Sequence, residues 1–183
     1  MMRTAILSWC LMSLGCAAIA TPAYAGDADG CSHFSWDVSH ELKVMKQAAA
    51  PVTAAAKPGP QAPVIRIDEL YELKLSPQSG VTYSAKPAKP TLNDSAQGGL
   101  VRFHVDKAGL YRVSITSGHW IDIVDSGKLI RSRDFQGARG CERPRKIVEY
   151  ELPGDKDLTL QLSGSPDASV VLSVTAVAGA PTG

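Results

Sequence analysis

A strict alternation of apolar and polar residues runs through most of the chain after residue 64. The strings VRFHV (101–105) and LYRVSIT (110–116) place apolar side chains at every second position, and the turn string DKAG separates them. Successive side chains of a strand point to opposite faces, so this pair predicts a β-hairpin with one buried face. The pattern recurs, with turn residues between its copies, in YELKL (71–75), HWIDIVDSGKLI (119–130), IVEYEL (147–152), LTLQLSG (158–164) and SVVLSVTAV (169–177).

These strands are short, polar on one face and separated by turn signals, and no strand–helix–strand rhythm appears among them. Such a pattern predicts an all-β domain over residues 64–178, either a sandwich or a small barrel. We expect an antiparallel, jelly-roll-like β-sandwich of about seven or eight strands, followed by a tail at 179–183. Residues 84–99 are rich in Pro and Gly, and Pro87 and Pro90 argue against a central strand, so we expect a loop there.

The first 25 residues predict export. Arg3 precedes an apolar run over residues 5–20, and the string AYA that ends at Ala25 fits the cleavage site of a secretory signal peptide. Cys16 leaves a lipoprotein signal open as an alternative. The apolar run is short for a transmembrane helix, and we predict no transmembrane segment elsewhere in the chain. We expect cleavage near Ala25/Gly26 and a mature chain of about 158 residues, enough for one domain with a core.

Net charge and cysteine content indicate which classes of partner and which cellular compartment to expect. Cleavage would remove Arg3 and no acidic residue, which leaves 18 Lys and Arg against 18 Asp and Glu. This zero net charge argues against nucleic acid as a partner. In an oxidising compartment we expect the two remaining cysteines, Cys31 and Cys141, to form a disulfide; two free thiols or a metal-binding pair are the alternatives. The bond would close a loop of about 110 residues, worth up to about 4.7 kcal/mol in the chain-entropy model.

Residues 26–47 contain the best helix candidate of the mature chain. In the string CSHFSWDVSHELKVMKQ, Ser35 can cap a helix and Asp37 favours its first turn. We expect this helix to lie on the sandwich as an N-terminal clasp held by the disulfide. Residues 48–63, rich in Ala and Pro, follow as a linker or an extended surface segment. The helix would pack through one apolar stripe made of Val38, Leu42, Met45 and Ala49.

The histidines are the candidates for a metal site. His33 and His40 stand seven residues apart, so they could share a helical face with Asp37 or Glu41. An iron site of the oxygenase type needs two histidines and a carboxylate on one face of the metal, and no pair of closely spaced histidines on a strand supplies it. The chain also has no G-x-S-x-G string and no glycine-rich phosphate loop between a strand and a helix. We therefore predict no metal and no cofactor.

One string concentrates positive charge in an otherwise neutral chain. RSRDFQGARGCERPRK (131–146) holds six cations against two anions. Guanidinium groups suit the planar, bidentate capture of carboxylate, sulfate or phosphate, so the string is a candidate anion-binding loop. The alternative is a solvated loop whose arginines pair with Glu149 and Glu151. The six cations are Arg131, Arg133, Arg139, Arg143, Arg145 and Lys146.

Trp120 and Asp122 share one face of a predicted strand, with Ile121 and Ile123 on the other. If the isoleucines face the core, Trp120 and Asp122 face outward and suit contact with a sugar or a partner protein. With the opposite register, Trp120 is a core residue.

The string AGLYRVSITSGHWIDIVDSGKLI, with Cys141, RKIV and LQLSG after it, resembles a family of small, uncharacterised exported proteins of Gram-negative bacteria. The likeness runs over most of the mature chain and implies a periplasmic or secreted β-sandwich. Some members of that family carry the label homogentisate dioxygenase, which would imply an iron site. Histidines that relatives have just before the second cysteine are missing from SRDFQGARGC here. The repeated hairpins bear a weaker resemblance to pre-peptidase C-terminal β-sandwich domains.

We expect a non-enzymatic binding or accessory protein. It would recognise an anionic small molecule, a glycan or an envelope protein through the arginine-rich loop. A metal-dependent oxygenase or a hydrolase is the first alternative, and a structural subunit of an envelope complex is the second. The candidate ligand-binding residues are Arg139, Arg143, Arg145, Lys146, Trp120 and Asp122.

Overall fold

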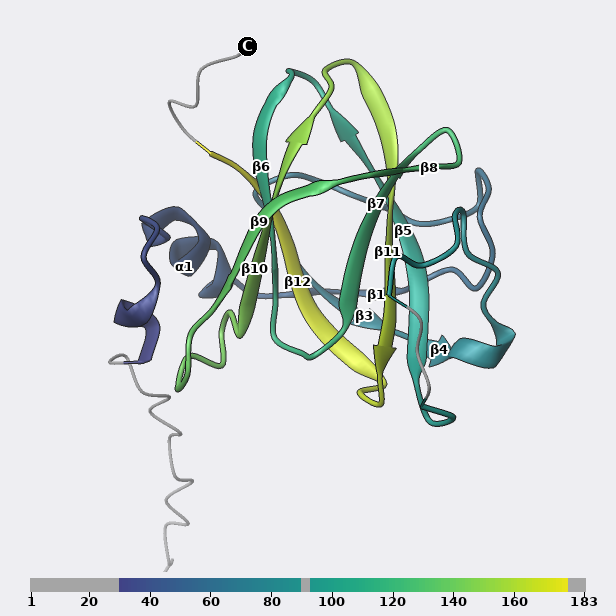
Figure 1. Cartoon of the computed structure of the whole chain (residues 1–183), viewed down its shortest axis with the longest axis horizontal. Coiled ribbons are helices and arrows are strands. Elements are labelled where there is room, and N and C mark those ends of the chain that lie inside the picture. Colours follow the sequence, from purple (N-terminus) through teal and green to yellow (C-terminus); the bar gives the residue numbers. More distant parts are fainter. Residues whose placement is uncertain (1–29, 90–92, 178–183) are drawn as a thin grey trace, which may run out of the picture.

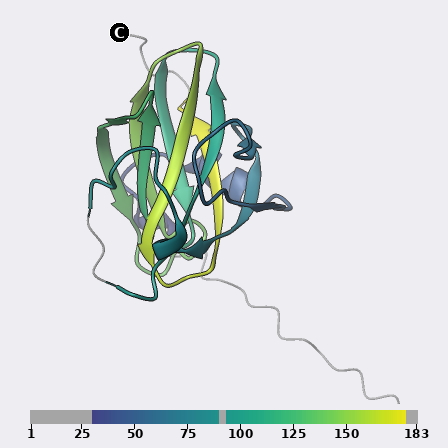
Figure 2. The same cartoon turned by 90° about the vertical axis from the view of Figure 1, so that its right-hand side faces the viewer.

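The computed structural model describes residues 30–89 and 93–177 and shows a sandwich of two β-sheets (Figure 1, Figure 2). Across the first sheet, the order is β1 (Ala50–Thr53), β3 (Leu70–Lys74), β12 (Ser169–Ala176), β6 (Gly109–Ile115), β10 (Lys146–Leu152) and β9 (Ser132–Gly137). Across the second, it is β2 (Val64–Ile65), β5 (Gln97–Val105), β11 (Lys156–Ser165), β7 (Trp120–Asp125) and β8 (Lys128–Ile130); β4 (Ser76–Pro77) also pairs with β5. The predicted all-β sandwich is confirmed.

The number and direction of the strands differ from the prediction. The described residues form twelve strands rather than seven or eight, and the sheets are mixed rather than purely antiparallel. β1 runs parallel to β3, and β2 runs parallel to β5. The strands β1, β2, β4 and β8 have only two to four residues each. Such strands are too short for an alternation of apolar and polar residues to stand out in the sequence.

The core lies between the sheets and consists of the apolar residues that the alternation singled out. On β5, Val101, Phe103 and Val105 are fully buried. Tyr150 on β10 is 1% exposed, and its hydroxyl donates to the carbonyl of Ile121 on β7 at 2.9 Å. This bond ties the first sheet to the second and satisfies a phenol that would otherwise be buried without a partner.

The N-terminal clasp is shorter and differently capped than predicted. A 3₁₀ turn (η1, Gly30–His33) precedes the helix α1 (Ser39–Met45), whose N-cap position is Val38. Ser35 is not the cap, because it exchanges two hydrogen bonds with Gln136 of β9 instead. The carboxylate of Asp37 accepts the backbone N–H of Ser39 at 2.9 Å and orders the first turn.

The clasp covers the outer face of the first sheet. Val44 and Met45 of α1 are buried against Leu70. Ahead of the helix, Phe34 and Val38 form a second cluster with Ala138, Cys141 and Ile147, against which Leu42 is only partly buried. The predicted stripe is therefore divided between two clusters, because the helix has only seven residues.

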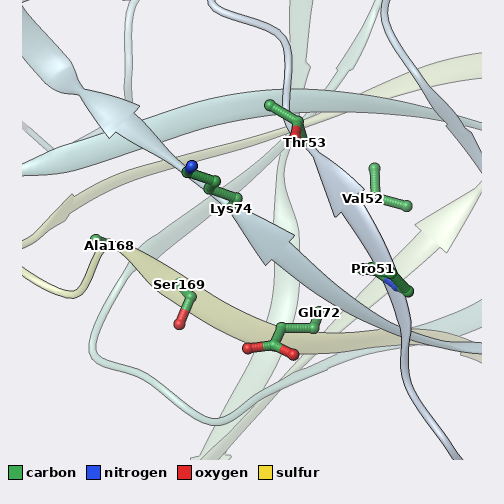
Figure 3. Close-up of a pocket in the computed structure, with 7 residues that line it drawn as sticks. All are labelled: Pro51, Val52, Thr53, Glu72, Lys74, Ala168 and Ser169. Carbon is green, nitrogen blue, oxygen red and sulfur yellow. The ribbon is translucent and has the colours of Figure 1, made fainter.

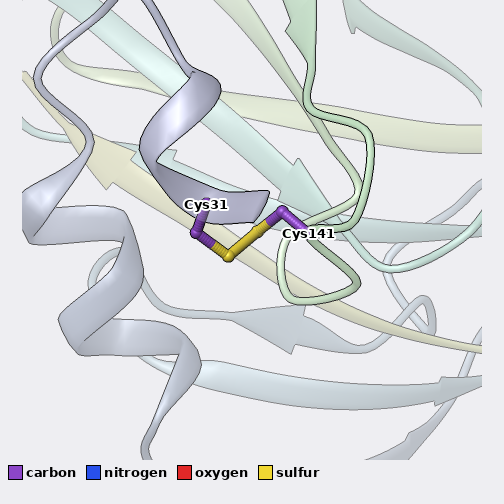
Figure 4. The surroundings of a disulfide bond; sticks show 2 residues. All are labelled: Cys31 and Cys141. Atoms are coloured by element: carbon purple, nitrogen blue, oxygen red, sulfur yellow. A yellow bond between two sulfur atoms is a disulfide. The ribbon is translucent and has the colours of Figure 1, made fainter. Parts of the chain in front are cut away.

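The disulfide between Cys31 and Cys141 is confirmed, with the two Cα atoms 4.7 Å apart (Figure 4). It joins η1 to the loop between β9 and β10. Gly30 packs directly on this loop, since a Cβ there would lie 2.2 Å from the carbonyl carbon of Gly140.

Residues 48–63 lie on the sandwich as an extended surface segment. They form the edge strand β1, and the backbone of Ala55 exchanges hydrogen bonds with Leu100. Ala54 and Ala62 are buried, and Pro51 is tolerated because β1 is an edge strand.

The predicted signal peptide (1–25) and tail (179–183) fall outside the described residues. No helix in the described part of the chain is long and apolar enough to cross a membrane.

Candidate anion-binding site

The predicted ligand-binding residues divide between two neighbouring strand ends. Trp120 and Asp122 lie on the outer face of β7; Trp120 is 37% exposed, but Asp122 is only 5% exposed. Lys146 is the first residue of β10, and its amine donates to the carbonyl of His119, the residue before Trp120. The start of β10 and the start of β7 therefore meet at one corner of the sandwich. Arg145 precedes Lys146, and we include it in this corner because its positive charge acts on the Lys146 amine.

Lys89 completes this corner, although the sequence of its segment indicates only a loop. Its amine lies 5.7 Å from the centre of the Trp120 ring. At that distance a cation is attracted by the negative face of the indole. We call Lys89, Trp120, Arg145 and Lys146 the cationic corner.

The segment 81–89, which we call the strap, places Lys89. It crosses the outer face of the second sheet and is fixed there by side chains of β7 and β11. The Tyr83 hydroxyl donates to the carbonyl of Leu162 at 3.1 Å, and the amide of Gln161 bonds the backbone N–H and carbonyl of Ala85 at 3.4 and 2.9 Å. Burial raises the pKa of Tyr83 to about 12, so this hydroxyl keeps its proton.

Asp122 supports the strap rather than facing a ligand. One carboxylate oxygen accepts the Trp120 indole N–H at 2.9 Å, and the other accepts the backbone N–H of Ala88 at 3.1 Å. The amide of Gln161 approaches the same second oxygen at 3.5 Å. Asp122 lies on the outer face of β7, as expected when Ile121 and Ile123 face the core, but the strap covers it and leaves it only 5% exposed. Its role is to fix the orientation of Trp120 and the end of the strap.

The charges of the corner act on Lys146. Burial, reinforced by the positive charges of Lys89 and Arg145, lowers the pKa of the Lys146 amine to about 8. Within the described residues, none of these three cations has a carboxylate within ion-pair distance. Among the residues that the structure describes, the corner is therefore a concentration of positive charge without a neutralising carboxylate.

A shallow hollow of about 390 Å³ continues from the corner into the β9–β10 loop. Arg139 and Arg145 line it together with Glu142 and the disulfide residue Cys141. Arg143 is exposed and is not part of this lining. The structure thus brings together Arg139, Arg145, Lys146 and Trp120 along one surface and leaves Arg143 and Asp122 out of it.

The alternative that the arginines pair with strand carboxylates holds for one of them. Arg133 Nε lies 4.0 Å from Glu149. The main partner of Glu149 is Arg112, which is 7% exposed beneath the clasp. Arg112 Nε donates to Glu149 at 3.0 Å, and its Nη1 donates to Glu41 at 3.2 Å and to the Asp37 carbonyl at 2.8 Å. We call Glu41, Arg112 and Glu149 the buried ion cluster; it fastens the clasp to the first sheet.

The histidines do not assemble a metal site in the described residues. No group of three or more His, Cys, Asp or Glu residues there lies close enough to hold an ion. His33 is exposed, and His40 Nε2 lies 2.7 Å from Asp68. His119 is fully buried and bonds Ser117 Oγ through Nδ1 at 2.6 Å, and burial lowers its pKa to about 4. This serine–histidine pair is closed to solvent.

A second hollow of about 430 Å³ lies beside β1 at the far edge of the first sheet (Figure 3). Its charged residues, Glu72 and Lys74, lie on β3 and are both exposed. Figure 3 shows their charged ends pointing apart, so this hollow presents no concentrated charge of one sign. It is a weaker candidate than the cationic corner.

Comparisons with known proteins identify no family for the chain. No family model matches the chain, and no curated protein matches it significantly. Among solved structures, the chain is similar to β-glucosidase from Kluyveromyces marxianus in a complex with glucose and in a selenomethionine-labelled form. Both comparisons have 12% sequence identity and a TM-score of 0.31. They cover 45% and 57% of this chain but only 10% and 13% of the β-glucosidase chain.

Proposed function

We propose that the protein is an exported, non-enzymatic binding protein that recognises an anionic ligand at the cationic corner. The observation that carries the proposal is the gathering of Lys89, Arg145 and Lys146 beside the exposed Trp120, without a carboxylate in ion-pair distance among the described residues. Like charges held together raise the free energy of the unliganded protein, and a bound anion relieves this repulsion.

The corner also suits an anion of a particular kind. Arg145 offers a planar fork for a carboxylate, sulfate or phosphate group, and the ammonium groups of Lys89 and Lys146 add point charges. The indole of Trp120 supplies an apolar face for a ring attached to that group. The hollow that continues to Arg139 gives room for a second anionic group. These features together favour an acidic glycan or a small ring compound that bears an anionic group.

Calorimetric titration of the mature protein with oligogalacturonate and with heparin oligosaccharides tests the proposal, with maltooligosaccharide as the neutral comparison. We expect the anionic sugars to bind, with an affinity that falls as salt rises. Arg145→Gln and Lys89→Gln should each weaken binding by about tenfold, the typical contribution of a hydrogen bond to a charged group.

Arg131→Gln is the matched control, because Arg131 is exposed on the connection between β8 and β9 and has no ion pair among the described residues. It should leave the affinity unchanged. Equal binding of the neutral sugar, or equal losses in Arg131→Gln and Arg145→Gln, would refute the proposal.

A further inference from the structure

We propose that Lys146 is a carbonyl-reactive lysine that forms an imine with aldehydes or ketones carrying an anionic group. This inference rests on the proposed function, since the same corner would hold the anionic part of the compound. It adds a covalent step and a class of ligand that simple anion binding does not require.

The position of the amine supports the inference. Lys146 is half-buried at the first residue of β10, and its amine is held by a hydrogen bond to the carbonyl of His119. That bond uses one N–H of the amine and leaves the lone pair of the neutral form available to a carbonyl carbon. It also restrains a side chain that is otherwise among the most flexible in proteins. His119, whose carbonyl accepts the bond, directly precedes Trp120 in the chain.

The neighbouring charges supply both activation and orientation. A lysine close to other cations and partly removed from water is deprotonated more readily, which is how proteins activate amines toward carbonyl compounds. Its pKa of about 8 leaves close to half of the amine neutral at pH 8. Lys89 and Arg145 can hold the anionic group of the incoming compound, so that its carbonyl lies beside Lys146.

The chemistry needs no further component. The amine nitrogen attacks the carbonyl carbon, the carbonyl oxygen takes up the amine protons and leaves as water, and a carbon–nitrogen double bond remains. No electrons are exchanged with another molecule, and water reverses the step. The bound state is therefore a reversible covalent adduct, compatible with a protein that captures and later releases its ligand.

Pyridoxal 5′-phosphate is a suitable probe, used purely as an aldehyde that carries a phosphate, and pyridoxal is its counterpart without the phosphate. The folded mature protein is treated with each at pH 8, reduced with borohydride, digested and mapped by mass spectrometry. Lys128, exposed on β8, is the internal control. We expect Lys146 to be labelled more than about tenfold faster than Lys128, because burial and the neighbouring cations Lys89 and Arg145 favour the neutral, nucleophilic form of the Lys146 amine. The preference for the phosphate-bearing probe should fall in Arg145→Gln and in Lys89→Gln.

Labelling of Lys146 no faster than Lys128 would overturn the inference, and equal rates with the two aldehydes would overturn the role of the anionic group. Lys146→Arg, checked for folding by circular dichroism, should lose the selective adduct while keeping the positive charge. Pyridoxine 5′-phosphate, which has no aldehyde, separates this inference from the proposed function. If it binds in an Arg145-dependent way while Lys146 is not trapped by the aldehyde, the anion site stands and the reactive lysine fails. If it does not bind, the anion site fails.

Discussion

Replacing Arg112 by Met should strongly destabilise the protein, because it leaves two carboxylates buried without their cation. Glu41 is 2% exposed and Glu149 is 7% exposed, and both accept hydrogen bonds from Arg112. The same guanidinium lies 4.7 Å from the centre of the Trp36 ring and bonds the Asp37 carbonyl. One substitution therefore removes the charged contacts that hold Glu41 and the Asp37 carbonyl of the clasp to the first sheet.

The expected loss is about 4 kcal/mol in the free energy of unfolding. Breaking a buried ion pair by removing one partner costs about 3–5 kcal/mol, most of it from the charge that stays behind. Arg133 Nε, 4.0 Å from Glu149, offsets a small part of this cost, since its side chain is 61% exposed and well solvated. If the cost comes from the stranded charges, the triple variant Glu41→Met, Arg112→Met, Glu149→Met should recover most of it.

Urea unfolding followed by circular dichroism measures these differences. Arg102→Met is the matched control. Arg102 and Asp157 both lie on the second sheet and form an ion pair at 3.5 Å, in which the Asp157 side chain is 63% exposed. A surface pair of this kind is worth less than about 1 kcal/mol. Hydrogen exchange should also show faster opening of residues 30–49 in Arg112→Met. The reasoning is refuted if Arg112→Met costs no more than Arg102→Met, or if the triple variant is as unstable as the single one.

Three further predictions concern acid, reduction and the strap. Stability should fall as the pH drops from 6.5 towards 4, because the unfolded chain protonates His119 while the buried native ring stays neutral. The loss should reach about 3 kcal/mol at low pH, and urea midpoints of His119→Asn should lack this component. Reduction of Cys31–Cys141 should lower the unfolding free energy by up to about 4.7 kcal/mol, and an unchanged melting temperature in reductant would contradict this. In Gly98→Ala, the new Cβ would lie 2.2 Å from the Tyr83 hydroxyl and should break the hydrogen bond of that hydroxyl to the Leu162 carbonyl. Hydrogen exchange would detect this as faster opening of residues 81–89. Gly80→Ala is the control, because nothing lies within 4 Å of its new Cβ, and it should leave exchange unchanged.

The sandwich was predictable because its long strands bury an apolar face and carry polar residues on the opposite face, which gives an alternating pattern in the sequence. The alternation runs over residues 101–105 of β5 and 158–162 of β11, and the apolar residues of both stretches are buried. The short edge strands lacked that signal, and their pairing, including the two parallel pairs, depends on which neighbour the tertiary fold supplies.

The polar residues are harder to interpret from sequence, because a polar strand face can be covered by another segment instead of by solvent. The clasp covers the outer face of the first sheet, so Arg112 and Glu149 are buried despite standing at polar positions of the alternation. The strap likewise buries Asp122 on the outer face of the second sheet. Ser35 failed as a helix cap for a related reason, since a tertiary partner, Gln136, competes for it across 101 positions of sequence.

The candidate site shows the same division. The arginine-rich loop and Trp120 were visible as composition and spacing, and the cysteine count was enough to place Cys141 inside that loop in a disulfide. Lys89 was not visible as part of the site, because it lies 31 positions before Trp120 in the sequence. It is placed beside Trp120 by the hydrogen bonds that hold the strap. A string of cations in sequence is thus a poor guide to which of them converge.

The cationic corner is fixed from two sides by contacts that are remote from it in sequence. On one side, Asp122 and Gln161 hold the strap that carries Lys89. On the other, the disulfide and the packing of Gly30 on Gly140 hold the loop that carries Arg139 and Arg145, and the backbone N–H of Arg145 bonds the Ile115 carbonyl at 2.9 Å. Groups that are ordered before a ligand arrives lose little entropy on binding. The clasp contains no residue of the corner, but by keeping the arginine-rich loop in place it would contribute to the anion affinity that we propose for the corner.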